Sequence, residues 1–119
     1  MPKTTSRITK LAARKQGRAA PSVLYEGWLI EQLKDPAEAA AYLEAVIEDG
    51  DQATLMLALR QIARAQGGIA HIARKAKLTR EATYKMLSKA GNPELKSFKA
   101  VLKATGLRIA VKPIEKRAA

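Results

Sequence analysis

Cysteine is absent from this chain, and histidine occurs once, as His71. Without cysteine there can be no disulfide bond, thiolate zinc site or thiol nucleophile, and the composition fits a reducing cytosol. A lone histidine cannot build a metal site, so His71 is interpreted as a polar surface residue or a neighbour of a phosphate. We therefore expect a cytoplasmic protein with no metal and no cofactor.

Long apolar runs and catalytic motifs are missing as well. No segment reaches the roughly 18 apolar residues of a membrane helix, and the N-terminus lacks the apolar core of a signal peptide. There is no phosphate-binding GxxxxGKS or GxxxxGKT, no GxGxxG after a strand and no nucleophile elbow. The chain of 119 residues is expected to be one small domain that is not an enzyme.

Acidic residues are scarce outside one segment. The chain carries 22 Lys and Arg against 11 Asp and Glu, a net charge of +11. Residues 1–25 hold six bases and no acid, residues 26–51 hold eight acids and one base, and the remainder is again strongly basic. A basic half suits a polyanion such as DNA, because binding releases condensed counterions. The acidic segment is either a solvated helix face or a surface for a basic protein partner.

The charge pattern also suggests the domain boundaries. Residues 1–23 are interpreted as a flexible basic arm that adds phosphate contacts, with an organelle transit peptide and disorder without a role as the alternatives. The predicted domain covers residues 24–114, and residues 115–119 are a tail.

Residues 69–88 have the pattern of a helix-turn-helix. Ile69, Ile72 and Ala73 lie on one face of a first helix, and the small Ala73 allows two helices to cross closely through a short turn. Lys77 stands where such turns usually carry glycine, and a positive φ there would cost on the order of 1 kcal/mol. Leu78 is the apolar residue of the turn. An ordinary buried helical hairpin is the alternative.

The second helix of this pair carries the expected DNA contacts. Thr79 is a good N-cap, and the inward residues are Ala82, Thr83, Met86 and Leu87. Outward side chains near its start would read base edges in the major groove, and neighbouring lysines and helix ends would bind phosphates. The predicted DNA-binding residues are Thr79, Arg80, Glu81, Tyr84, Lys85, Ser88, Lys89, Lys75 and Lys96.

Cap residues place the two preceding helices. Asp35 and Asp51 are predicted N-caps of helices that run to about Asp49 and Gln66, and Gly50 between them is expected to adopt the left-handed conformation.

The last helix is expected to begin at an Asn92 cap and to stop at Gly106. Its inward residues are predicted to be Leu95, Phe98, Val101 and Leu102. Residues 107–112 alternate apolar and polar and predict a short strand, which cannot be stable alone. Residues 25–29 offer a weak partner strand within the chain, and a second copy offers a better one. We expect a homodimer through Leu107, Ile109 and Val111.

Two stretches resemble a known family. LKDPAEAAAYLEAVIEDGD, followed by LALRQIARAQGGIAHIARKAKLTREATYKMLSKAGNPELKSFKAVLKATGLRIAV, is similar to the addiction-module antidote proteins. These are HigA-like antitoxins with a lambda-repressor-like helix-turn-helix. The similarity spans about Leu24 to Val111, and Lys77 departs from the family's usual turn glycine.

The resemblance implies an all-α, lambda-repressor-like helix-turn-helix bundle of about five helices with a short C-terminal strand. It also implies a sequence-specific DNA-binding antitoxin of a type II toxin-antitoxin module, which neutralises a RelE-like mRNA-cleaving toxin and autorepresses its operon. Such toxins are basic, so the expected toxin contacts are Glu38, Glu44, Glu48 and Asp49. The alternatives are a stand-alone helix-turn-helix transcription regulator without a toxin partner and a general nucleic-acid-coating protein, for which the few aromatic residues provide little base stacking.

Overall fold

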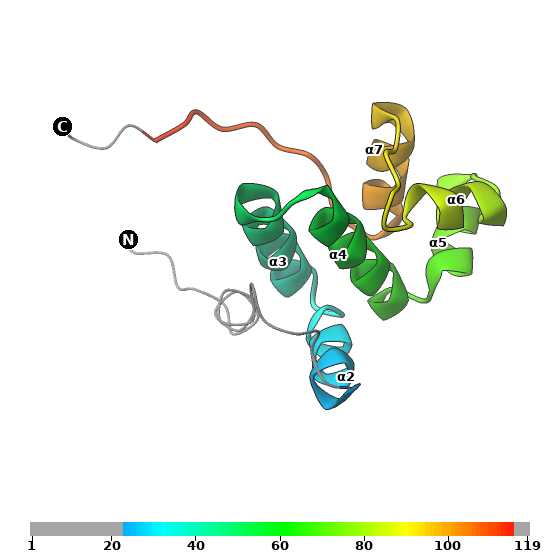
Figure 1. Cartoon of the computed structure of the whole chain (residues 1–119), viewed down its shortest axis with the longest axis horizontal. Helices are drawn as coiled ribbons and strands as arrows, with labels where there is room; N and C mark the ends of the chain where they lie inside the picture. The colour runs from blue at the N-terminus through cyan, green and yellow to red at the C-terminus, as the bar shows by residue number, and fades with distance from the viewer. Residues whose placement is uncertain (1–22, 116–119) are drawn as a thin grey trace.

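The computed structural model of the chain describes residues 23–115, which form six helices and no strand (Figure 1). The prediction of an all-α fold is therefore confirmed. No helix in this part of the chain is long and apolar enough to cross a membrane. The expected arm at residues 1–23 lies outside the described residues except for Val23. The helices are α2 (Val23–Gln32), α3 (Pro36–Asp49), α4 (Gln52–Ala65), α5 (Ile69–Ala76), α6 (Arg80–Met86) and α7 (Leu95–Ala104).

The N-caps of α3 and α4 are the two predicted aspartates. The amide of Ala37 donates to Oδ1 of Asp35 at 3.0 Å, and Pro36 fills the first position of α3, where no amide is needed. The amide of Thr54 donates to Oδ1 of Asp51 at 2.8 Å and lowers the pKa of that carboxyl. Each cap supplies a hydrogen bond that the first helical turn lacks.

Gly50, between these helices, does not adopt the predicted left-handed conformation. Its φ of −92° and ψ of 163° are extended, so that prediction is wrong. The reason for a glycine is close packing instead, because a Cβ at this position would lie 2.7 Å from the carbonyl oxygen of Val46.

Two groups of buried side chains form the core. The larger group joins α2, α3 and α4, with Leu33, Leu59 and Ile62 fully buried, and it also takes in Leu87 and Leu102. The smaller group joins the end of α4 to α5 and α7. Figure 1 shows α3 and α4 side by side, with α5, α6 and α7 grouped beyond α4. The larger group fixes α2, α3 and α4, and the smaller one attaches the α5 to α7 unit to them.

Residues 25–29 lie in helix α2, so the weak alternative of a strand there is wrong.

A polar network beneath α2 links this helix to α3 and α4. The Tyr42 hydroxyl donates to Oε1 of Gln61 at 2.7 Å, and the Gln61 amide donates to both carboxylate oxygens of Glu26 at 3.0 and 3.2 Å. Burial raises the pKa of Tyr42. These contacts are distant in sequence, which is why the local pattern of α2 did not reveal them.

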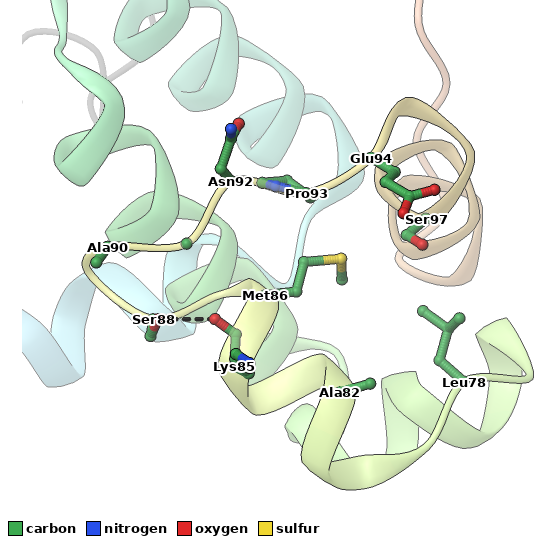
Figure 2. A pocket seen from close by; sticks show the side chains of 11 residues that line it. Leu78, Ala82, Lys85, Met86, Ser88, Ala90, Asn92, Pro93, Glu94 and Ser97 are labelled. Atoms are coloured by element: carbon green, nitrogen blue, oxygen red, sulfur yellow. Dashed lines mark hydrogen bonds between the residues drawn. The ribbon is translucent and has the colours of Figure 1, made fainter.

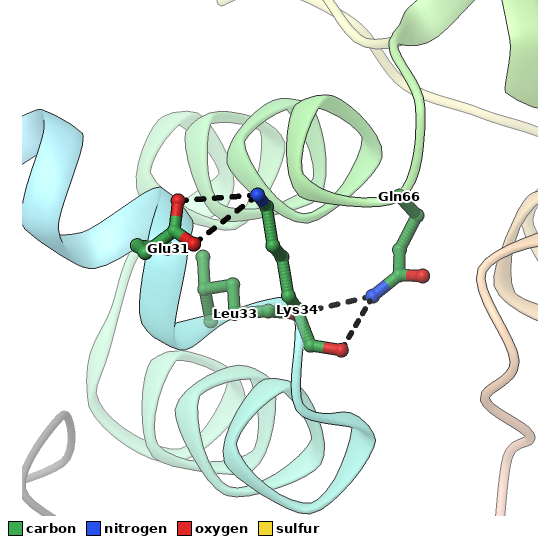
Figure 3. Close-up of polar contacts among 4 residues, drawn as sticks. All are labelled: Glu31, Leu33, Lys34 and Gln66. Carbon is green, nitrogen blue, oxygen red and sulfur yellow. Dashed lines mark hydrogen bonds and ion pairs between the residues drawn. The ribbon is translucent and has the colours of Figure 1, made fainter.

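The turn between α2 and α3 is held by a side chain from the end of α4. The Gln66 amide donates to the carbonyls of Leu33 and Lys34 at 3.2 and 3.3 Å, and Lys34 pairs with Glu31 at 3.1 Å (Figure 3). Two carbonyls at the end of α2 thus gain a donor, as helix C-termini require.

The start of α7 differs from the prediction. Its N-cap is Glu94, which makes no side-chain capping bond, so Asn92 is not the cap. Leu95 is 67% exposed and does not point inward, whereas Val101 and Leu102 are buried as predicted and Phe98 is partly buried. Residues 91–94 form the loop that carries the chain from the end of α6 to α7.

The end of α7 agrees with the prediction, but the strand after it is absent. Gly106 has a φ of +88°, and the Leu107 amide returns to the Leu102 carbonyl at 2.9 Å. Residues 107–115 have neither helix nor strand in the single chain, because no strand among the described residues is available to pair with them. Leu107 packs on the chain's own core, whereas Ile109 and Val111 are 44% and 92% exposed.

Candidate nucleic-acid interface

Helices α5 and α6 are joined by a turn of three residues, Lys77 to Thr79. Lys77 has a φ of 61° and a ψ of 40°, so it adopts the left-handed conformation for which such turns usually carry glycine. The Lys77 amide donates to Arg74 at 3.1 Å and the Leu78 amide to Ala73 at 2.9 Å, so carbonyls at the end of α5 are satisfied. Ala73 is buried, as a close approach of the two helices requires.

The first turn of α6 is fixed by two threonines. The Ala82 amide donates to Oγ1 of Thr79 at 3.1 Å, which confirms the predicted cap. Thr83 is fully buried, and its hydroxyl donates to the Thr79 carbonyl at 2.8 Å. The hydroxyl is thereby satisfied inside the core, so a threonine is tolerated where a branched aliphatic residue is more usual.

The core face of α6 agrees with the prediction except at one residue. Thr83 and Leu87 are buried and Met86 is partly buried, but Ala82 is exposed, so its expected place in the core is wrong. α6 has only seven residues, and Ala82 faces a groove beside the helix instead of α5.

All nine predicted DNA-binding residues are exposed. Two of them form a cation–π contact, in which the Arg80 guanidinium lies 5.7 Å from the centre of the Tyr84 ring. Arg80, Glu81, Tyr84 and Lys85 belong to α6, which presents them on one short helix. The remaining residues lie around it: Thr79 and Ser88 at the ends of α6, Lys89 in the following loop, Lys75 at the end of α5 and Lys96 in the first turn of α7.

A groove of about 420 Å³ runs beside α6, between its second turn and the first turn of α7 (Figure 2). Leu78 and Met86 project into it, and Lys85 and Ser88 lie along its edge. The Ser88 hydroxyl is used internally, since it donates to the Lys85 carbonyl at 2.7 Å. The other side is lined by residues of the loop to α7, which no sequence motif marks as part of a groove: Ala90, Gly91, Asn92, Pro93 and Glu94.

The loop after α6 is anchored from α4. The Gln52 amide donates to the Gly91 carbonyl at 3.1 Å, and the Arg60 guanidinium donates to the Leu87 carbonyl. A Cβ on Gly91 would lie 1.9 Å from the Met86 carbonyl oxygen, so only glycine fits there. These long-range contacts set the position of the groove.

The predicted acidic surface lies on α3, on the other side of α4 from α7 (Figure 1). Glu44, Glu48 and Asp49 are exposed there, whereas Glu38 is partly buried. One of these acids is already engaged, because Lys112 Nζ of the C-terminal segment lies 3.9 Å from Glu44 Oε1. Glu44 and Lys112 are far apart in the sequence, so no local pattern indicates this contact.

Within residues 23–115, no group of three or more acidic, histidine or cysteine side chains is placed to hold a metal ion. His71 is partly buried and packs beside Gly67, where a Cβ would lie 2.6 Å from the imidazole Cδ2. The His71 side chain therefore packs against the turn at Gly67, between α4 and α5.

A known protein family matches most of the described part of the chain. The family described as "probable addiction module antidote protein" matches residues 28–113. An uncharacterized protein of Haemophilus influenzae (strain ATCC 51907 / DSM 11121 / KW20 / Rd) is 36% identical over 81 residues, which cover 68% of this chain and 82% of that protein. No solved structure matches the chain.

Proposed function

The chain belongs to the addiction module antidote family, and from this premise we propose that it is the antitoxin of a type II toxin-antitoxin module. It binds operator DNA through a lambda-repressor-like helix-turn-helix formed by α5 and α6, represses its own operon and neutralises a RelE-like mRNA-cleaving toxin. The observation that carries the DNA-binding part is the short, capped helix α6, which exposes Arg80, Tyr84 and Lys85 while Thr83 and Leu87 hold it to the core.

The DNA contact proposed for α6 is insertion of its first turns into the major groove. Arg80 and Lys85 then pair with guanine edges or phosphates, and Tyr84 packs on a sugar or a thymine methyl. The contact between Arg80 and the Tyr84 ring supports this role. It restricts both side chains before DNA binds, so less conformational entropy is lost on binding.

Two copies are proposed to bind one palindromic operator. The exposed Ile109 and Val111 support pairing of residues 107–112 with the same segment of a second copy, which would supply the missing ladder hydrogen bonds. The two α6 helices would then be spaced by one DNA turn, about 34 Å.

The proposed toxin surface is α3, because its exposed carboxylates complement a basic partner. A tagged product of the adjacent open reading frame, co-expressed with this chain, tests this proposal by co-purification. The test variant is Glu44→Lys with Glu48→Lys, and the matched control, with the same change in charge, is Glu94→Lys with Glu115→Lys.

We expect the unaltered chain and the control to co-purify with the tagged toxin. The α3 variant should no longer co-purify with it. Full retention of the α3 variant would place the toxin contact elsewhere. Failure of the unaltered chain to bind any adjacent product would favour a stand-alone transcription regulator.

A further inference from the structure

A second depression, also of about 420 Å³, lies between the end of α5 and α7. Three lysines surround it, Lys75 and Lys77 from the end of α5 and Lys103 from α7, and its remaining lining is alanine: Ala76, Ala100 and Ala104. We propose that Lys77 and Lys103 join Lys75, already a predicted DNA contact, in binding phosphates of the duplex DNA backbone, independently of the base contacts of α6. The choice of duplex DNA as the partner rests on the proposed function.

The three lysines are brought together without a compensating acid. Within residues 23–115 none of them lies within ion-pair distance of a carboxylate, and α5 and α7 contain no acidic residue. Like charges around one depression repel each other, and a bound polyanion removes that repulsion. By contrast, Lys34 and Lys112 each contact a glutamate.

The backbone at Lys77 provides an independent argument. Helices α4, α5 and α7 end in the same way. The amide of the residue that follows a positive-φ residue donates to a carbonyl five residues earlier: Gly68 to Ala63, Leu78 to Ala73 and Leu107 to Leu102, at 2.8, 2.9 and 2.9 Å. The positive-φ residue is Gly67 in α4 and Gly106 in α7, but Lys77 in α5. Glycine adopts this conformation without strain, whereas lysine does not. A strained residue that adds the third charge of a cluster points to a role in binding.

A DNA backbone fits this cluster better than a small phosphate ion does. The three lysines are exposed, and the alanine side chains of the floor offer no hydrogen-bond donor, so the site provides mobile point charges and no fixed cradle. A duplex presents rows of phosphates and releases counterions for each lysine that pairs. Lys96 and Lys99 on α7 extend the same basic surface.

The test is binding of the full chain to a fluorescent duplex of arbitrary sequence, measured by anisotropy over a series of salt concentrations. The cluster variant carries Lys75→Ala, Lys77→Gly and Lys103→Ala. The control carries Lys34→Ala, Arg64→Ala and Arg117→Ala, which removes the same charge from residues outside α5, α6, α7 and the 107–112 segment. We expect the cluster variant to lose about 0.9 units of log–log salt slope per lysine and the control to lose less than about one unit in total.

Lys77→Gly alone separates folding from binding. We expect its denaturation midpoint to rise, because the strain is removed, while its affinity for the duplex falls. Equal salt slopes in the cluster and control variants would overturn the inference. So would competition by inorganic phosphate beyond that of chloride at matched ionic strength, or cluster-dependent binding that prefers single-stranded RNA. Retained operator selection by a cluster variant with unchanged slope would refute this site and leave the proposed function standing.

Discussion

The hydroxyl of Tyr42 on α3 donates a hydrogen bond of 2.7 Å to Oε1 of Gln61 on α4, and both side chains are buried. Gln61 in turn donates to Glu26 on α2, so one polar chain connects three helices through the core. Buried polar groups stabilise a unique packing only when each is satisfied.

Replacement of Tyr42 by Phe should lower the free energy of unfolding by about 1–3 kcal/mol, because Oε1 of Gln61 loses its buried donor. Urea denaturation followed by circular dichroism measures the change. Tyr84→Phe is the matched control, since Tyr84 is exposed, and it should shift stability by less than about 0.5 kcal/mol. Equal stability of the two variants would mean that the Tyr42 hydroxyl contributes nothing.

Stability should also fall in alkali because of Tyr42. Burial raises the pKa of Tyr42 in the folded state, whereas the unfolded residue ionises near pH 10. The stabilising contribution is therefore fully present below about pH 10 and is lost as the pH rises above it. Melting temperatures measured on either side of that pH should fall more steeply for the unaltered chain than for Tyr42→Phe; parallel curves would contradict this.

Two glycines should respond to alanine in opposite directions. Gly91→Ala should destabilise the fold by at least about 2 kcal/mol, since its Cβ would meet the Met86 backbone. Gly27 lies within α2 with open space around it, so Gly27→Ala should stabilise by about 0.5–1 kcal/mol. Thermal melts of both variants provide the comparison, and a tolerated Gly91→Ala would show that the loop after α6 is not held as described.

Ile109→Pro should convert the proposed dimer to a monomer, because proline removes a ladder donor in the centre of the paired segment. Sedimentation velocity measures the oligomeric state. Ile114→Pro, beyond the segment, serves as the control and should remain dimeric. A dimer that survives Ile109→Pro would place the interface on another surface, with α3 as the next candidate.

Features fixed by neighbouring residues could be predicted from the sequence. The caps at Asp35, Asp51 and Thr79 each depend on an amide two or three residues away. The exposure of Arg80, Tyr84 and Lys85 on α6 followed from helical spacing, whereas the exposure of Ala82 did not.

Features set by distant contacts could not be predicted in this way. α2 is held by Gln61 and Gln66, more than thirty residues further along the chain. The loop before α7 is anchored by a bond between Gln52 and Gly91, which lie 39 residues apart in the sequence. Residues 107–112 have a strand pattern, but a strand also requires a partner, and the single chain does not supply one.

Binding of the chain to the DNA upstream of its own gene tests the account most directly. We expect Arg80→Ala with Lys85→Ala to lose at least about 30-fold in operator affinity with unchanged helical content, because both side chains are exposed and each base contact contributes about 1–3 kcal/mol. Lys34→Ala with Arg64→Ala, which removes the same charge from side chains paired with acids of α2, should lose far less. Wild-type affinity and sequence preference in the Arg80 and Lys85 double variant would contradict the assignment of α6 as the DNA-reading helix.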